Sequence, residues 1–141
     1  MTADPGVVLD ASALVAYAQN DLRALPVEEL LRELREDTGA AVHIPCCACG
    51  DAVEIVRDDK AATSRLASFA ASYGVVTASR TEHQVIASIV AEASVSHGLA
   101  HAMLVAAGQG SSLATYAAAT VLRAGLDERL ILDLDEFFRP E

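Results

Sequence analysis

The stretch VVLDASALVAY, residues 7–17, decides how the sequence is interpreted. A short aliphatic run ends at Asp10, and an alanine-rich apolar segment follows it directly. The run is typical of a buried strand and the segment of a helix, with Asp10 or Ser12 as its N-cap. A carboxylate at a strand end can also be the first ligand of a metal site. The rest of the chain must therefore supply the other ligands or lack them.

The composition is that of an aliphatic, folded domain. The 141 residues are 52% hydrophobic, with a mean hydropathy of +0.32, so we expect one domain spanning residues 1–141. The net charge of −10 argues against a broad basic surface for nucleic acid. It does not argue against a local nuclease site, because carboxylates that hold a divalent cation are themselves acidic.

Three features favour a cytoplasmic protein without a membrane segment. No segment approaches the roughly 18 apolar residues that a membrane span needs. The first residues, MTADPG, do not resemble a signal peptide. The three cysteines, at positions 46, 47 and 49, form an odd and local set that suits a reducing compartment better than a disulfide framework.

Short apolar runs alternate with helical patterns along the whole chain. The patterns predict strands at residues 7–10, 41–44, 75–78, 112–115 and 129–133. They predict helices at residues 12–20, 27–37 (ended by Gly39), 45–59, 61–72, 81–95, 98–107 and 117–123. Non-alternating strands separated by helices indicate an α/β fold, a three-layer α/β/α sandwich with a central, mainly parallel five-stranded sheet. Such sheets place their sites at the carboxyl ends of strands.

This pattern resembles the PIN domain and, within it, the VapC-like toxin ribonucleases. The resemblance rests on VVLDASALVAY, on IPCCACGDAVEI (residues 44–55) and on GLAHAMLVAAGQGSSLATYAAA (residues 98–119). It implies that Asp10 and Asp51 are catalytic and hold Mg²⁺ or Mn²⁺, with Glu54 as the other candidate ligand and the Ser12 hydroxyl near the ion. The ion would activate water for hydrolysis of RNA phosphodiesters.

The chain departs from the family pattern in its second half, which has no Asp or Glu between Glu92 and Asp127. The family normally has one acid at the start of the buried helix and another after the Leu–x–Thr strand. At the first place this chain offers Gly98, Leu99 or His101, and at the second Tyr116, Ala117 or Ala118. We therefore expect weak binding of Mg²⁺ or Mn²⁺ and weak or lost activity. The alternative is a non-catalytic PIN-like module for partner binding or dimerisation.

Each candidate also has a plainer interpretation. Asp10 and Ser12 are suited to helix capping alone, and Asp51 or Glu54 can face solvent or pair with Arg57. His101 can replace an oxygen ligand, which would favour Mn²⁺, or simply pack in the buried helix. Tyr116 can stack on an RNA base or fill the space of the missing acid.

The cysteines allow three interpretations. Cys46 and Cys49 have the C-x-x-C spacing of a redox site at a helix start. Zinc held by His43, Cys46, Cys47 and Cys49 would crowd four ligands into seven residues. The common case is that such cysteines are small buried hydrophobic residues.

The helix at residues 27–37 has one apolar face and one acidic face, as a solvated outer helix does. In VapC-like proteins the early helices border the groove that receives an antitoxin. The resemblance therefore implies an antitoxin partner, RNA as a possible substrate, and a homodimer.

Overall fold

Five parallel strands form the centre of the molecule in the computed structural model, which describes residues 6–36 and 41–137. The sheet has the order β3-β2-β1-β4-β5, and each neighbouring pair is parallel. The strands are β1 (Val7–Leu9), β2 (Val42–Pro45), β3 (Val75–Val76), β4 (Ser112–Thr115) and β5 (Ile131–Asp133). The predicted parallel five-stranded sheet is confirmed, with β1 at its centre.

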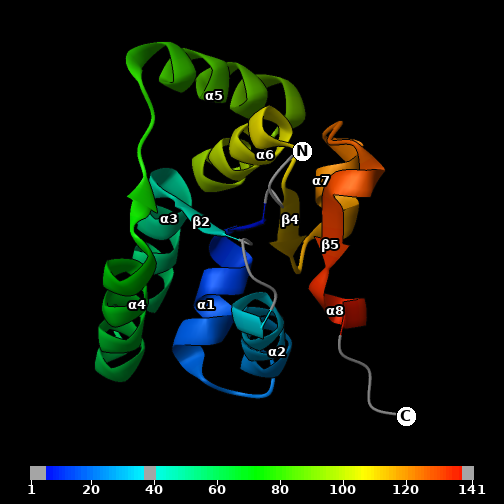
Figure 1. Cartoon of the computed structure of the whole chain (residues 1–141). Helices are drawn as coiled ribbons and strands as arrows, with labels where there is room; N and C mark the ends of the chain where they lie inside the picture. The colour runs from blue at the N-terminus through cyan, green and yellow to red at the C-terminus, as the bar shows by residue number, and fades with distance from the viewer. Residues whose placement is uncertain (1–5, 37–40, 138–141) are drawn as a thin grey trace.

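Helices cover both faces of this sheet (Figure 1). Helices α1, α2 and α4 pack on one face, α5, α6 and α7 pack on the other, and α3 contacts both α1 and α6. The bounds are α1 (Ala11–Gln19), α2 (Ala24–Glu36), α3 (Cys46–Val56), α4 (Lys60–Tyr73), α5 (Arg80–Ala93), α6 (His97–Gln109), α7 (Ala118–Arg123), the 3-10 helix η1 (Glu128–Leu130) and α8 (Leu134–Phe137). The predicted three-layer α/β/α sandwich is therefore confirmed.

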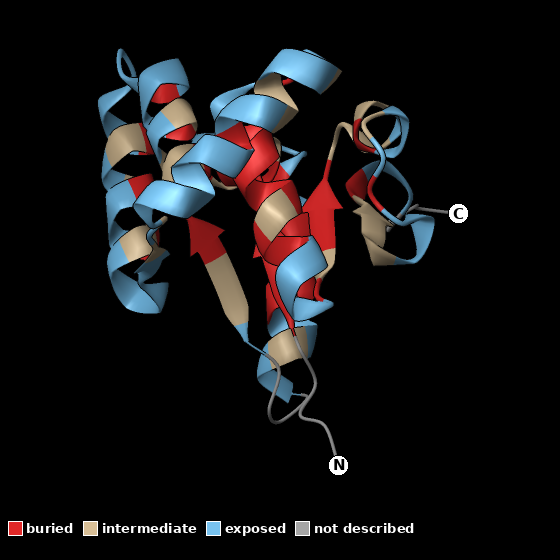
Figure 2. Ribbon diagram, turned by 90° about the horizontal axis from the view of Figure 1, so that it is seen from above, coloured by how far each residue is buried: buried red, intermediate tan, exposed pale blue. Residues whose placement is uncertain are grey.

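The position of β1 between two layers of helices explains why its sequence does not alternate between apolar and polar residues. Leu9 points into the core beneath α1, α2 and α4, whereas Val8 points into the core beneath α5 and α6, and both are fully buried. A strand covered on both faces must be apolar at every position. Figure 2 shows the buried residues gathered in the middle of the molecule and the exposed ones on the outer helix faces.

Helix α6 is buried as its uncharged sequence predicts, and it approaches α3 very closely at Gly98. A Cβ atom on Gly98 would lie 2.3 Å from Asp51 Oδ2 and 2.9 Å from the Cα atom of Ala48. Both distances are below real packing distances, so only glycine fits there. This contact fixes the start of α6 against α3.

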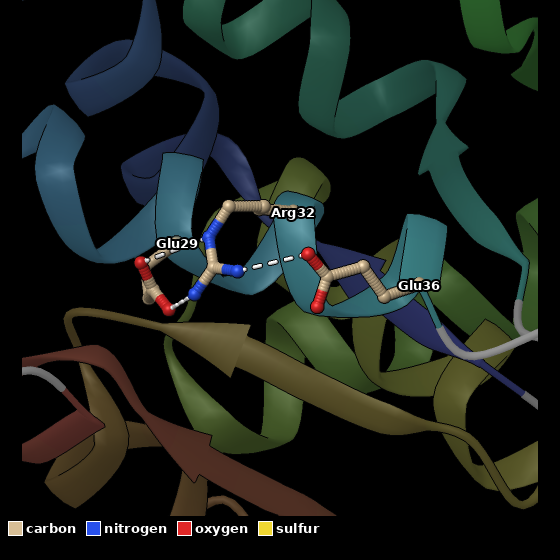
Figure 3. A network of polar contacts seen from close by, with 3 residues as sticks. All are labelled: Glu29, Arg32 and Glu36. Carbon is tan, nitrogen blue, oxygen red and sulfur yellow. Dashed lines mark hydrogen bonds and ion pairs between the residues drawn. The ribbon is translucent and has the colours of Figure 1, made fainter.

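Helix α2 begins at Ala24, three residues before the predicted start, and Pro26 lies in its first turn. On its solvent side Arg32 pairs with Glu29 and Glu36 (Figure 3). Exposed pairs of this kind contribute little to stability. The predicted helix end at Gly39 lies outside the described residues.

Helices α5 and α6 meet across a bend of 115°. In the described parts of the chain, no single helix is both long enough and apolar enough to cross a membrane. The combined length and composition of α5 and α6 would suffice, but the two helices are bent apart. In α5, Ile86 is buried and Ile89 and Val90 pack against the core, whereas Val85 is 41% exposed.

Candidate functional site at the carboxyl edge of the sheet

The carboxylate of Asp10 is buried where β1 ends, with 2% of the residue exposed. Its Oδ1 accepts hydrogen bonds from Ser12 Oγ at 2.6 Å and from the backbone N–H of Ala13 at 3.0 Å. Its Oδ2 accepts a hydrogen bond from Thr115 Oγ1 at 2.6 Å. Asp10 is therefore the N-cap of α1, as predicted, and it also ties the end of β1 to the end of β4.

The two hydroxyls that reach Asp10 are themselves held in place by backbone donors. Ser12 Oγ accepts from the N–H of Tyr116 at 3.0 Å, and Thr115 Oγ1 accepts from the N–H of Ala117 at 2.8 Å. Each hydroxyl accepts one hydrogen bond and donates its own proton to the carboxylate. The sequence prediction did not include Thr115, although Thr115 closes the Leu–x–Thr motif that supported the family resemblance.

Burial dominates the electrostatics of Asp10. Loss of water raises the pKa of Asp10 above its ordinary value, and the hydrogen bonds from Ser12, Thr115 and Ala13 only partly oppose this. None of the ion pairs within the described residues includes Asp10. A bound cation would relieve the cost of holding this charge in the interior.

Asp51 and Glu54, the two candidates for the second ligand, have partners of their own. Asp51 Oδ2 accepts from the N–H of Gly98 at 2.9 Å, so its charge faces the first turn of α6. An acid at a helix N-terminus is favourable because the free N–H groups carry partial positive charge. Glu54 is exposed and pairs with Arg57 at 2.6 Å, which is the plainer of its two predicted roles. No hydrogen bond given by the described structure joins Asp10 to either acid.

Tyr116 points along the surface beside the end of β4. Its hydroxyl donates to the carbonyl of Arg23, and the Arg23 guanidinium lies 4.2 Å from the centre of its ring. Partial burial raises the pKa of the Tyr116 hydroxyl. These contacts hold the side chain against the loop before α2. That Tyr116 fills the space of the missing acid stays a prediction. Base stacking by Tyr116 stays a prediction.

His101 is almost fully buried, at 1% exposure, and faces the start of α3. Its Nδ1 lies 3.3 Å from the backbone N of Cys47, which donates to it, and 3.9 Å from the Sγ of Cys46. Burial lowers the pKa of His101, so the ring is neutral at pH 7 and offers a lone pair. The predicted packing of His101 in the buried helix is what the structure has, together with this contact to α3.

The cysteines of α3 are free thiols. Burial, together with the neighbouring Cys46 and Asp51, raises the pKa of Cys47 to about 11. Burial and Cys46 also raise the pKa of Cys49. Redox-active thiols have lowered pKa values, so the raised pKa of Cys49, one of the two cysteines of the C-x-x-C pair, gives the redox interpretation no support.

The metal-binding side chains that do converge are not the carboxylates. Within the described residues, the one group of three or more His, Cys, Asp or Glu whose ligand atoms gather is Cys46, Cys47 and His101. The cluster shares two cysteines with the predicted local zinc set, but His101 takes the place of His43 and Cys49. These residues do not fit the three- or four-carboxylate centre of the family. A weak Mg²⁺ or Mn²⁺ site at Asp10 with Asp51 stays a prediction.

No protein-family model matches the sequence, and no curated protein matches it. Solved structures do match the fold. PAE2754 from Pyrobaculum aerophilum has a TM-score of 0.61 and 17% identity, over 92% of this chain and 91% of its own. VapC20 of Mycobacterium tuberculosis, described as a Sarcin-Ricin loop cleaving toxin, has a TM-score of 0.61 and 18% identity, over 87% of this chain and 98% of its own. The chain therefore has the PIN-domain, VapC-like fold that its sequence pattern predicted.

Proposed function

We propose that this chain is a VapC-like PIN protein whose RNA cleavage is weak or lost and whose main activity is to bind a partner protein. The proposal rests on one observation: each of the three candidate acids binds a different partner in the fold. Asp10 caps α1, Asp51 faces α6 and Glu54 pairs with Arg57. A nuclease of this kind needs these charges to face one ion.

The chemistry follows from the oxygen donors that are available. Asp10 can still offer a lone pair of Oδ2 to Mg²⁺ or Mn²⁺, because a carboxylate oxygen has two lone pairs and the hydrogen bond from Thr115 uses one. One carboxylate with water ligands binds Mg²⁺ weakly, and the attacking water would lack a second fixed ligand to orient it. Cleavage would therefore be slow even where RNA reaches the sheet edge.

A ribonuclease assay tests the catalytic half of the proposal. The substrate is an RNA stem-loop of the sarcin-ricin type, since the structurally similar VapC20 is described as a toxin that cleaves that loop. We expect little cleavage by the wild type with Mg²⁺ or Mn²⁺, and Asp10→Asn should lower any residual metal-dependent cleavage further. Efficient metal-dependent cleavage that Asp10→Asn abolishes would refute the loss of activity.

The partner-binding half rests on a cavity between α1, α2 and α4, here called the α1–α4 groove. It has a volume of about 710 Å³ and is lined by Tyr17, Glu28, Leu31, Arg35, Arg65, Ser68, Phe69, Ser72 and Tyr73. Arg65 donates to the carbonyl of Tyr17 at 2.8 Å and to Glu28 at 2.7 Å, and its guanidinium stacks 4.1 Å from the Tyr17 ring. The groove thus combines ordered aromatic walls with charges of both signs.

By its family resemblance, the occupant of the α1–α4 groove is a segment of an antitoxin in the cytoplasm. The test is coexpression with the small proteins encoded beside the chain, followed by affinity purification. Ser68→Arg fills the groove, whereas Ser64→Arg, one turn away on α4 and also exposed, leaves it open. We expect a partner to copurify with the wild type and Ser64→Arg but not with Ser68→Arg. A chain that purifies without any of these proteins would overturn the proposal.

A homodimer is the second assembly that the resemblance implies. Apolar side chains are exposed on α3, β3 and α5, namely Val53, Ile55, Val75 and Val85. Contact between copies would remove from water those of these side chains that it covers. Sedimentation equilibrium measures the state directly, and we expect Ile55→Lys to shift a dimer toward monomer. A wild-type monomer at high concentration contradicts this assembly.

A further inference from the structure

We propose that Cys46, Cys47 and His101 form a binding site for a thiophilic metal ion, with Zn²⁺ as the physiological ion and the fourth position open to solvent. This site is separate from the carboxylates of the family centre. It also stands apart from the proposed partner binding, because none of its three residues lines the α1–α4 groove.

The geometry is the first support. The ligand atoms of the three side chains all lie within 4.8 Å of one another. Zinc binds sulfur at about 2.3 Å and imidazole nitrogen at about 2.0–2.1 Å in a tetrahedral arrangement, so two ligands on one ion lie roughly 3.5–3.8 Å apart. Cys46 Sγ and His101 Nδ1 are already 3.9 Å apart. Small side-chain rotations would bring the set onto one ion.

The donor types are the second support. Two sulfurs and one imidazole are soft or borderline ligands that select zinc or copper(I) over magnesium. Three protein ligands with one open position are the arrangement of catalytic zinc centres, including those with two cysteines and one histidine. The two thiolates would also balance the charge of Zn²⁺, which limits the cost of placing the ion in a half-buried position.

The positions of the ligands in the fold are the third support. His101 comes from the middle of buried α6, while Cys46 and Cys47 open α3 directly after β2. The close packing of α3 on α6 at Gly98 holds the two helices together near the cluster. His101 is therefore fixed by the core, whereas both cysteines are partly exposed, which leaves solvent a path to the ion.

The ring of His101 is already oriented for this role. Its Nδ1 lone pair faces α3, where the Cys47 N–H donates to it at a long 3.3 Å and the Cys46 thiol lies at 3.9 Å. A metal ion would take over that lone pair. The backbone N–H of Cys47 would then lose its acceptor on His101. It lies in the first turn of α3, where backbone N–H groups have no partner within the helix and can bind water instead.

The test is metal binding by the reduced full-length chain, first with Co²⁺ as a spectroscopic probe and then with Zn²⁺ in competition with a chromophoric chelator. We expect one ion per chain and sulfur-to-cobalt charge-transfer absorption. Cys46→Ser and His101→Gln should lower the affinity by at least about tenfold, since even the loss of an outer-shell partner has an effect of that size.

Cys49→Ser is the matched control, because Cys49 lies on the same helix but outside the cluster. It should bind zinc as the wild type does. His101 is buried, so His101→Gln can lower zinc affinity by disturbing the fold. Cys46 is partly exposed, so Cys46→Ser tests the ligand role without that ambiguity. Zn²⁺ should raise the melting temperature of the wild type and of Cys49→Ser, but not that of Cys46→Ser. Absence of thiolate-to-cobalt absorption, or equal losses in Cys46→Ser and Cys49→Ser, would overturn the site.

Discussion

The buried carboxylate of Asp10 makes two substitutions at one position behave very differently. Asp10→Ala removes the N-cap of α1, which costs about 1 kcal/mol. It also removes the acceptor at 2.6 Å from the buried Thr115 hydroxyl and leaves it only the longer contact to Ser12 Oγ at 3.5 Å, a further cost of about 1–3 kcal/mol. Ser12 is only partly buried and can turn to water. The free energy of unfolding should therefore fall by roughly 2–4 kcal/mol.

Asp10→Asn keeps the cap and removes the buried charge. Its carbonyl oxygen can accept from Ala13 and Ser12, and its amide can donate to Thr115 Oγ1. Residue 10 then stays hydrogen-bonded to Thr115, while the Thr115 O–H turns to Ser12 Oγ, 3.5 Å away. Asn is as good an N-cap as Asp. We therefore expect Asp10→Asn to be as stable as the wild type, within about 1 kcal/mol, or more stable.

The pH dependence has a definite sign. Because burial raises the pKa of Asp10 above the unfolded value of 3.8, the folded state binds this proton more readily than the unfolded state. The charged carboxylate thus lowers wild-type stability at neutral pH. As the pH falls through the raised pKa toward 3.8, the wild type should gain stability relative to Asp10→Asn.

Urea unfolding of the three proteins, followed by circular dichroism at about pH 7 and near pH 4.5, measures these differences directly. An Asp10→Ala variant within about 0.5 kcal/mol of the wild type would refute the network described here. So would an Asp10→Asn variant as unstable as Asp10→Ala.

Other substitutions test the contact between α3 and α6 and the state of the thiols. Gly98→Ala should destabilise the fold by about 1–3 kcal/mol in urea unfolding, because its Cβ overlaps Asp51 and Ala48. The control Gly50→Ala, on α3 with open space around it, should be neutral or stabilising by up to about 1 kcal/mol. Asp51→Asn should cost about 0.5–1 kcal/mol by weakening the charge at the start of α6, and comparable unfolding midpoints would contradict that role. Cys47, with its pKa near 11, should alkylate slowly at neutral pH and faster as the pH rises, as peptide mass spectrometry after iodoacetamide treatment can measure.

The sequence predicted the fold because each strand can be recognised from its own short stretch of residues. The run at 7–9 is apolar on both faces, and Leu113 and Ala114 of β4 enter the cores on opposite faces of the sheet. A parallel sheet covered on both sides buries such residues. Boundaries were less certain where a proline was the only signal. Helix α2 starts before Pro26 because the first turn of a helix tolerates proline as well as the first position does.

The candidate site was predictable only in part, because its contacts join distant segments. Asp10 as an N-cap follows from adjacent residues, and the structure agrees. The approach of His101 to Cys46 spans 55 residues and depends on how α6 crosses α3. No local spacing encodes that crossing. The glycine at position 98 was a usable signal, since a glycine inside a buried helix indicates close contact with another element.

The hydrogen bond from Thr115 to Asp10 spans 105 residues and has a consequence for synthesis of the protein. The central strand emerges first from the ribosome, but its neighbour β4 follows only near the end of translation. At roughly 5–20 residues per second, β1 waits about 5–20 seconds for that neighbour. During this interval the nascent chain exposes an unpaired strand edge. A chaperone that shields the growing chain would therefore act mainly before β4 arrives.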